Sequence, residues 1–338
     1  MQFENIIGQK EVKKQLTEMI QHNRLSHALL FLGKEGSGAL SLAMAFAQYI
    51  VCENANGKKP ASAGALFGEP EPVNNELLSD SCGICPACTK ANQLVHPDIH
   101  FSYPVIPRKA GDKPISTDYI IEWREFISLH PYTNAYDWLQ FIGAENKQGN
   151  ITAHECNDII RKLNLKSFES EYKILIMWLP EFLGKEGNKL LKLIEEPPPN
   201  TLFLLVAENE DQILQTILSR TQLVKIPRLT NSEVEEEISK QGREKQKQFL
   251  KYFTHLLEQA IRLKVIETNA QGSFANAEQD FALRLNKLCT ISQQEAIINE
   301  LDQASYYIER NANAKMLFHA LSIKLYHIIS NNSLILIN

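Results

Sequence analysis

The chain has 338 residues, of which 44% are hydrophobic and 22% charged, and its formal net charge is −5. This is the composition of a globular protein with enough length for two or three domains. The acidic balance excludes a strong overall basic field that would hold the chain on DNA by itself. We find neither the basic and apolar regions of a secretory signal nor an apolar run of about 18 residues that could span a membrane. We therefore expect a cytoplasmic protein.

The first predicted elements are an amphipathic helix over residues 9–23 and a short buried strand, HALLFLG, that ends at Gly33. Helical spacing resumes over residues 39–52. Strand, glycine-rich loop and helix therefore follow in the order that a βαβ unit requires.

The loop between this strand and helix resembles a phosphate-binding loop, G-x-x-x-x-G-K-[ST]. Gly33 and Gly38 have the required spacing, and Gly36 lies between them. In a working loop the backbone holds the phosphates, the lysine contacts the β- and γ-phosphates, and the hydroxyl binds magnesium. Here Ala39 and Leu40 replace the lysine and the hydroxyl residue. Losing one charge-assisted contact costs roughly 1.5–3 kcal/mol, so we expect no hydrolysis and no functional ATP site. The alternative is a glycine turn that only connects a strand to a helix.

Four cysteines predict a metal site. The polar segment 53–81 reads as a loop and leads to Cys82, Cys85 and Cys88, which are spaced by two residues each. Cys52, at the end of the preceding helix, is the natural fourth ligand. Four thiolates suit a closed, tetrahedral, structural zinc site.

Two alternatives to structural zinc remain at this point. One is an iron–sulfur cluster, which also uses Cys-x₂-Cys-x₂-Cys spacing, and the other is four free thiols. His96 and His100 are reserve ligands for a metal ion. Cys156 and Cys289 stand alone in helical patterns, and we interpret them as small buried apolar side chains.

Beyond the cysteines, strand-like runs alternate with helical patterns. The predicted strands are residues 98–104, YKILIMWL, TLFLLVAEN and the run after Ser219-Arg220-Thr221. Helices are predicted over about 117–130 and in NKLLKLIEEPPP, which its prolines end. Another helix begins near Ala153, because Thr152 and Glu155 have capping-box spacing. The alternation predicts a parallel α/β sheet up to about Pro227, and the later sequence has only helical spacing.

Three segments resemble one protein family in the same order along the chain. They are FENIIGQKEVKKQLTEMI with RLSHALLFLGKEGSG, then NKLLKLIEEPPPNTLFLLV, then ILSRTQLVKI. They resemble the AAA+ subunits of bacterial DNA polymerase III clamp loaders. The altered phosphate loop together with the cysteine cluster resembles the delta-prime branch of that family.

The resemblance implies a domain order. Residues 1–227 would form an AAA+ core of the phosphate-loop type, with a zinc-binding insertion at about 52–100. Residues 228–242 would be a remnant of the helical lid, or a lid that the sequence gives incompletely. Residues 243–338 would form an all-α C-terminal collar for oligomerisation.

The resemblance also implies a role for Arg220, with Ser219 beside it. In the family, the Ser-Arg segment projects its arginine into the ATP site of the neighbouring subunit, where a planar guanidinium stabilises charge on the γ-phosphate. Thr221 stands where the family usually has cysteine. Glu181 follows the YKILIMWL run, but the magnesium-binding aspartate of an active ATPase is missing there. We therefore expect a subunit that lacks its own ATPase activity and promotes that of a partner.

The implied partners are the ATP-hydrolysing gamma/tau subunits and the delta subunit, with the sliding clamp and primed DNA reached through the complex. Two other functions agree less well with the sequence. An autonomous AAA+ ATPase in DNA repair or helicase loading is disfavoured by the altered loop. A zinc-module protein that binds nucleic acid is disfavoured by the acidic balance.

Overall fold

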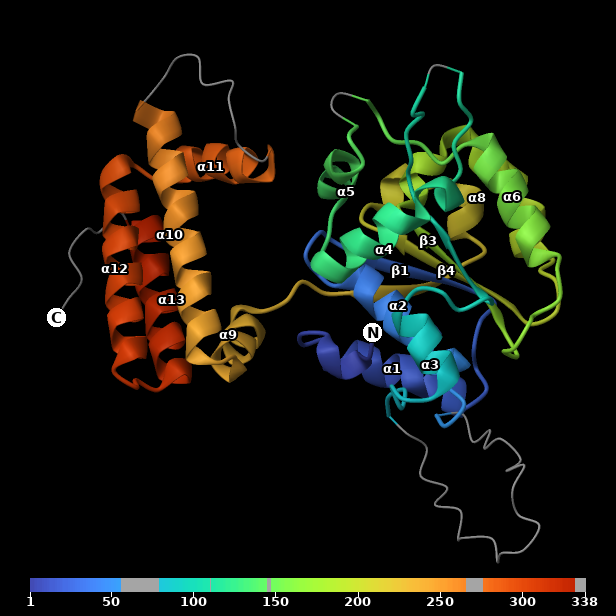
Figure 1. Cartoon of the computed structure of the whole chain (residues 1–338), viewed down its shortest axis with the longest axis horizontal. Coiled ribbons are helices and arrows are strands. Elements are labelled where there is room, and N and C mark those ends of the chain that lie inside the picture. The colour runs from blue at the N-terminus through green and yellow to red at the C-terminus, as the bar shows by residue number, and fades with distance from the viewer. Residues whose placement is uncertain (56–78, 110, 145–146, 266–275, 332–338) are drawn as a thin grey trace, which may run out of the picture. The chain divides into compact units, whose positions relative to one another are not determined.

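The computed structural model describes residues 1–55, 79–109, 111–144, 147–265 and 276–331. The chain forms two compact units, Met1–Leu229 and Thr230–Asn338, which are drawn in Figure 1. Most of the predicted loop 53–81 lies outside the described residues, and so do residues 266–275 and 332–338 of the predicted collar.

The first unit is an α/β unit. Its strands are β1 (Ala28–Gly33), β2 (Ile99–Ser102), β3 (Lys173–Trp178), β4 (Thr201–Ala207) and β5 (Gln222–Ile226). Its helices are α1 (Lys10–Gln21), α2 (Ala39–Val51), α3 (Pro86–Asn92), α4 (Ile120–Leu129), α5 (Ala135–Phe141), α6 (Ala153–Leu163), α7 (Asn188–Glu195) and α8 (Gln215–Leu218). Short 3₁₀ helices are η1 (Phe3–Asn5), η2 (Ser116–Tyr119), η3 (Pro180–Gly187) and η4 (Glu210–Gln212).

The five strands form one sheet in the order β2-β3-β4-β1-β5, and every neighbouring pair is parallel. β1 therefore lies between the central strand β4 and the edge strand β5. The apolar runs predicted as strands are β1, β3 and β4, whose residues are almost wholly buried because helices cover both faces (Figure 1).

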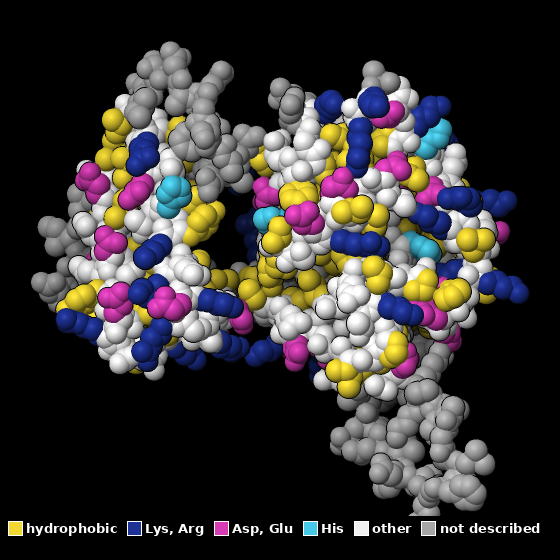
Figure 2. All heavy atoms as spheres, in the orientation of Figure 1, with side chains coloured by type: hydrophobic (Ala, Val, Ile, Leu, Met, Phe, Trp, Pro, Cys, Tyr) yellow, Lys and Arg dark blue, Asp and Glu magenta, His cyan; other side chains and the backbone are white. Residues whose placement is uncertain are grey.

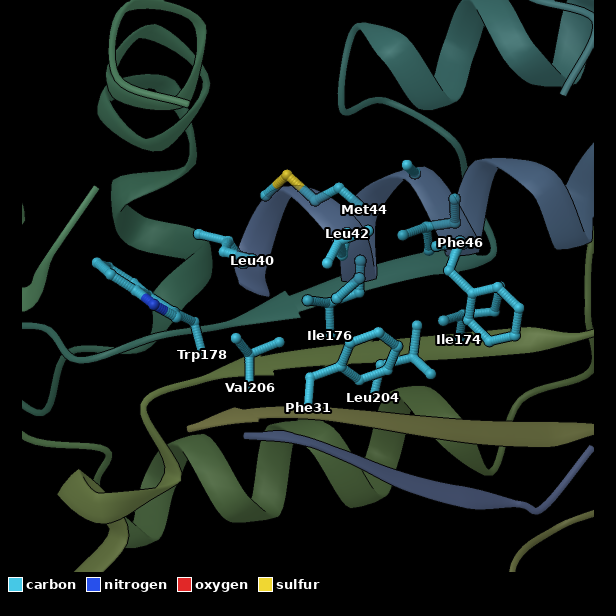
Figure 3. Packing of buried hydrophobic residues seen from close by; sticks show 14 of the residues in the cluster. Phe31, Leu40, Leu42, Met44, Phe46, Ile174, Ile176, Trp178, Leu204 and Val206 are labelled. Carbon is cyan, nitrogen blue, oxygen red and sulfur yellow. The ribbon is translucent and has the colours of Figure 1, made fainter. Parts of the chain in front are cut away.

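Successive side chains of each strand point to opposite faces of the sheet, so the first unit has two apolar cores, one on each face. Leu29 and Phe31 of β1 pack with α1 to α5, whereas Ala28 and Leu30 pack with α6 to α8. Figure 3 shows part of the first core, in which α2 lies across the sheet. The labelled side chains there are Leu40, Leu42, Met44 and Phe46 of α2, and Phe31, Ile174, Ile176, Trp178, Leu204 and Val206 of the strands.

The connection between β2 and α6 is longer than a simple crossover needs. The predicted helix at 117–130 is present as η2 and α4, but α5 was not predicted. Trp123 of α4 and Trp138 of α5 are fully buried, with ring centroids 5.2 Å apart in an edge-to-face arrangement. These rings fix α4 and α5 onto the same face of the sheet as α2.

The predicted start of α6 is confirmed, but the predicted capping box between Thr152 and Glu155 forms only in part. The helix begins at Ala153, and Thr152 Oγ1 accepts a hydrogen bond from Glu155 N at 3.2 Å. The Glu155 side chain does not complete a capping box. It is buried and accepts from Ser116 N at 2.7 Å, which joins α6 to η2.

The second unit is helical throughout its described residues. Its helices are α9 (Asn231–Lys240), α10 (Arg243–Val265), α11 (Asn276–Leu288), α12 (Ile291–Glu309) and α13 (Ala314–Asn331). They enclose a separate apolar core that includes Leu257, Leu301 and Ile328. The segment 228–242 contains one helix, α9, which contacts α13. Within the described parts of both units, no helix has the length and apolar character to cross a membrane.

The predicted fold class, a parallel α/β sheet followed by an all-helical region, is therefore confirmed.

Candidate functional sites

The glycine-rich loop lies at the carboxyl end of β1, between β1 and α2. Gly36 and Gly38 have φ angles of 77° and 81°, in the left-handed region that glycine adopts without steric cost. The loop is held from outside by Gln9, whose Nε2 donates to Ser37 O at 3.1 Å and to Pro227 O at 2.7 Å. The turn geometry of the motif is thus present.

The two replaced loop residues face the protein interior. Ala39 and Leu40 are 8% and 6% exposed, and Figure 3 shows Leu40 at the same end of the core as Trp178. An apolar side chain therefore stands where a working loop places the hydroxyl that binds magnesium.

The space in front of the loop is nearly filled. A Cβ added at Gly38 would lie 2.9 Å from Cε1 of Tyr132, and the Tyr132 hydroxyl accepts a hydrogen bond from Ile7 N at 2.7 Å. The cavity that remains has a volume of about 20 Å³. That is room for about one water molecule, whereas ligand pockets enclose roughly 300–1,000 Å³.

The strand ends beside the loop carry carboxylates. Glu181 Oε1 accepts hydrogen bonds from the backbone N of Glu208 at 2.7 Å and of Asn209 at 2.9 Å. Burial raises the pKa of both glutamates, and that of Glu208 to about 7, with the carboxylates of Glu181 and Glu35 adding to its rise. The raised pKa values favour the neutral form of both carboxyl groups, and the positive charge of Lys34 opposes the rise.

The four predicted cysteines come together in the first unit. Their sulfur atoms all lie within 4.8 Å of one another, and the 56–78 segment that separates Cys52 from the others lies outside the described residues. Backbone N–H groups point at the sulfurs, since Cys82 N donates to Cys52 Sγ at 3.3 Å and Cys85 N to Cys82 Sγ at 3.4 Å. Cys88 N donates to Cys85 Sγ at 3.4 Å. Such donors stabilise thiolates.

The cysteine cluster has the chemistry of a metal site. Hydrogen bonding with Cys88 lowers the pKa of Cys52 to about 4, and the same contact together with burial raises the pKa of Cys88. The four thiols can therefore bind a metal ion, and the group of possible ligands among the described residues contains no histidine. His96, a predicted reserve ligand, instead places its Nε2 atom 3.3 Å from Glu169 Oε1. Burial lowers the pKa of the other reserve ligand, His100, to about 4.

Arg220 lies in the turn between α8 and β5 and is 34% exposed along its side chain. Its Nη1 donates to Thr216 O at 2.7 Å and to Ser219 Oγ at 3.2 Å. Its Nη2 forms an ion pair with Glu195, the last residue of α7. The guanidinium is therefore oriented on the surface and is not buried in the core.

The strand register separates Arg220 from the glycine-rich loop of its own chain. In the pairing of β1 with β5, Gln222 lies opposite Leu29 and Ile226 lies opposite Gly33. Gln222 thus lies four residues, or roughly 13 Å, from the level of Gly33, and Arg220 lies in the turn before Gln222. Arg220 and the loop thus lie at opposite ends of the sheet.

Comparisons with known proteins identify the family of this chain. Residues 8–230 match the family described as "DNA polymerase III, delta subunit". The chain belongs to this family. A DNA polymerase III subunit delta' of Bacillus subtilis (strain 168) is 26% identical over 233 residues, which cover 69% of this chain and 52% of that protein.

Two further similarities involve other subunits of the same enzyme. The tau subunit of the same Bacillus strain is 26% identical over 233 residues, covering 69% of this chain and 30% of that protein. A gamma subunit-related protein of Thermotoga maritima is 13% identical, covers 94% of this chain and 99% of its own, and has a TM-score of 0.35. The chain thus spans about half the length of the delta' subunit and about a third of the length of the tau subunit.

Family membership confirms the predicted delta-prime-like clamp-loader resemblance and the AAA+ core with a helical region after it. The tau and delta' subunits have the same sequence identity to this chain, 26%. The subunit type therefore has to be argued from the site residues.

Sequence reasoning missed three residues of these sites. Tyr132 fills the loop, Glu195 holds Arg220, and Glu208 faces Glu181. Tyr132 belongs to no sequence motif. The one local signal near it is Asn134, whose Oδ1 accepts a hydrogen bond from Asp137 N at 2.8 Å and so caps the start of α5. Glu195 lies within the EEPPP segment, which predicts a helix end and carries part of the family resemblance but does not indicate a partner for Arg220.

Glu208 gives a pH-dependent prediction. Its folded pKa of about 7 exceeds the ordinary 4.5, so the folded protein binds an extra proton between these values and its stability falls as pH rises through this window. Glu208→Gln removes the ionised carboxylate. We expect it to raise the free energy of unfolding by about 1–2 kcal/mol above pH 7, after allowance for solvent screening, with little effect near pH 4.

The measurement is urea unfolding of both proteins at pH 4 and pH 8. Glu210→Gln, at an exposed position two residues away, is the matched control and should change stability by less than about 0.5 kcal/mol at either pH. An equal gain from Glu208→Gln at both pH values would contradict the assignment of the ionised carboxylate.

Proposed function

We propose that this chain is the delta-prime-type, non-hydrolysing subunit of a DNA polymerase III clamp loader. In this role it forms part of the subunit ring and places Arg220, with Ser219 beside it, at the ATP site of a neighbouring gamma/tau subunit. The observation that carries the proposal is that Arg220, an oriented surface arginine, lies at the opposite end of the sheet from the glycine-rich loop of its own chain. An arginine at that end of the sheet would meet a phosphate on another chain.

The loop residues support the absence of hydrolysis in this chain. Ala39 lacks the cation, Leu40 lacks the magnesium ligand, and Tyr132 fills the space for the phosphates. Glu181 Oε1 accepts hydrogen bonds from two backbone N–H groups at 2.7 and 2.9 Å, while its Oε2 is buried without a hydrogen-bond partner among the described residues. The chain thus keeps one carboxylate beside the loop but lacks the lysine and the magnesium ligand that phosphoryl transfer uses.

The chemistry of Arg220 suits assistance to a partner. A guanidinium is permanently charged and planar, and its fork of N–H donors matches phosphate oxygens. Its ion pair with Glu195 lies at the surface, and exposed ion pairs contribute only about 0–1 kcal/mol. Arg220 can therefore leave Glu195 and bind a neighbouring γ-phosphate with little loss of free energy.

The second unit supports a place in an oligomer. Several of its large apolar side chains are exposed, and a helical collar in contact with other subunits would cover them. The exposed residues are Phe249, Tyr252, Tyr306, Tyr307, Met316, Ile323 and Tyr326. The partners in this proposal are the gamma/tau and delta subunits, with the clamp and primed DNA reached through the complex. On the face drawn in Figure 2, Lys and Arg side chains are interspersed with Asp and Glu side chains over both units, which fits indirect contact with DNA.

We also infer that Cys52, Cys82, Cys85 and Cys88 hold a structural zinc ion. Four sulfur ligands from the chain leave no open position for a substrate. When bound, the ion supplies only a cross-link between the end of α2 and the start of α3. The domain boundaries at 227 and 242 and the lid assignment of 228–242 stay predictions.

The function is tested by measuring ATP hydrolysis with the isolated chain and with the complex reconstituted from cognate gamma/tau and delta subunits. We expect no turnover by the isolated chain and clamp-dependent turnover by the complex that falls when this chain is omitted. Turnover by the isolated chain at a motor-like rate of about 1 s⁻¹ or more would support the autonomous ATPase and overturn the proposal.

A further inference from the structure

We propose that residues 131–134, here called the loop-filling segment, are an internal occupant of the glycine-rich loop. In this view the segment takes the place of a nucleotide and would exclude one even if the missing lysine and hydroxyl were restored. The inference rests on the absence of ATP hydrolysis in the proposed function and deepens it, but its test by nucleotide binding does not depend on what Arg220 does.

Tyr132 makes the central contacts of the segment. Its ring packs against Gly38 so closely that a Cβ there would come within 2.9 Å of Cε1. Its hydroxyl accepts from Ile7 N at 2.7 Å, and Ile7 follows Ile6, whose Cγ2 would lie 3.6 Å from the same Cβ. The ring therefore bridges the loop and the N-terminal segment, two parts of the chain that are distant in sequence.

The residues on both sides of Tyr132 also bind the loop region. Ser41, in the first turn of α2, donates a hydrogen bond to Pro131 O. Asn134 Nδ2 donates to Glu35 Oε1 at 2.7 Å, and Glu35 belongs to the loop itself. The segment thus makes polar contacts with the loop at Glu35 and with α2 at Ser41, on either side of the ring contact at Gly38.

The segment is anchored by the helices that flank it. His130 N donates to Phe126 O at 2.8 Å at the end of α4. Asn134 caps α5, and Trp138 Nε1 of α5 donates to Pro104 O at 2.7 Å. Because Trp138 is fully buried, moving the segment away from the loop would require the packing of α5 to change.

Two independent blocks therefore act on nucleotide binding. The replacements at positions 39 and 40 remove attractive contacts, and the loop-filling segment removes the space, leaving about 20 Å³. Restoring the contacts alone should fail, because phosphates and the Tyr132 ring cannot occupy the same volume. Removing the ring in addition should open the loop.

The experiment compares three variants by calorimetric titration with MgATP. The variants are Ala39→Lys/Leu40→Thr, the same pair with Tyr132→Ala, and the same pair with Leu129→Ala as the control. Leu129 lies at the end of α4 and is 61% exposed. We expect the Tyr132 triple variant to bind MgATP at least about tenfold more tightly than the other two. Equal affinity for all three proteins, or no binding by the triple variant, overturns the inference.

A second measurement covers the case in which Leu40→Thr prevents folding, since Leu40 lies in the core. Hydrogen exchange is measured for residues 33–40 in the parent chain, in Tyr132→Ala and in Leu129→Ala. We expect exchange at least about tenfold faster in Tyr132→Ala alone, because the loop loses the side chain packed against it. Exchange that is unchanged in Tyr132→Ala contradicts the proposed role of the segment.

Discussion

Replacing Arg220 by alanine is expected to lower ATP turnover of the reconstituted clamp loader by about 10³-fold or more, without preventing assembly. The expected loss is large because a guanidinium that meets the γ-phosphate stabilises charge that develops only in the transition state. Assembly should persist because Arg220 lies on the surface of the first unit, whereas the exposed apolar residues proposed as a collar interface lie in the second.

The measurement is steady-state ATP turnover in the presence of clamp and primed DNA, with complex formation followed by size-exclusion chromatography. Arg220→Lys should give an intermediate rate, because lysine retains the charge but not the planar fork. Unchanged turnover with Arg220→Ala would overturn the role of the residue. Loss of the complex would show that Arg220 acts in assembly and not on phosphate.

Glu195→Gln is the matched control for Arg220. It removes the ion-pair partner while leaving the guanidinium and its hydrogen bonds to Thr216 O and Ser219 Oγ. Because exposed ion pairs contribute about 0–1 kcal/mol, turnover should change by less than about fivefold. A loss as large as that of Arg220→Ala would mean that the ion pair itself is required.

The sequence predicted the strands and their parallel pairing well, for a physical reason. Strands buried on both faces read as nearly continuous apolar runs, and the runs around Leu30, Ile176 and Leu204 are such segments. The cysteine cluster was equally predictable, because short spacing leaves Cys82, Cys85 and Cys88 few ways to lie apart. Glycine spacing predicted the turn between β1 and α2, and Ala39 and Leu40 predicted that this loop has lost the residues that bind phosphate and magnesium.

Contacts between segments that are distant in sequence could not be predicted in this way. Tyr132 fills the loop because α4 and α5 deliver it there, and those helices are placed by the packing of buried tryptophans. Glu155 had the spacing of a capping box, yet its carboxylate binds Ser116 N of η2 instead. In both cases the tertiary partner, which local sequence does not contain, decides where the side chain goes.

Removing the metal from the cysteine cluster should destabilise the first unit by several kcal/mol, since structural zinc sites bind with roughly 10–16 kcal/mol in small peptides and part of that is folding free energy. The residues just before Cys82 form hydrogen bonds with the N-terminal segment of the chain. Gln2 Nε2 donates to Ser81 O at 2.7 Å, and Glu4 N donates to Asp80 Oδ2 at 2.9 Å. Loss of the ion should therefore also loosen the N-terminal segment.

The test is metal analysis, thermal unfolding and limited proteolysis of the parent chain, Cys52→Ser and Cys156→Ser. Cys156 is a matched control because it is equally buried but lies in α6, outside the cluster. We expect about one zinc per parent chain and per Cys156→Ser chain, and weaker zinc retention with earlier cleavage near the N-terminus in Cys52→Ser. Zinc should also be lost more readily below about pH 6, because protons compete for the thiolates. Iron in place of zinc would identify a cluster of the other type, and undiminished zinc affinity in Cys52→Ser would remove that residue from the ligand set.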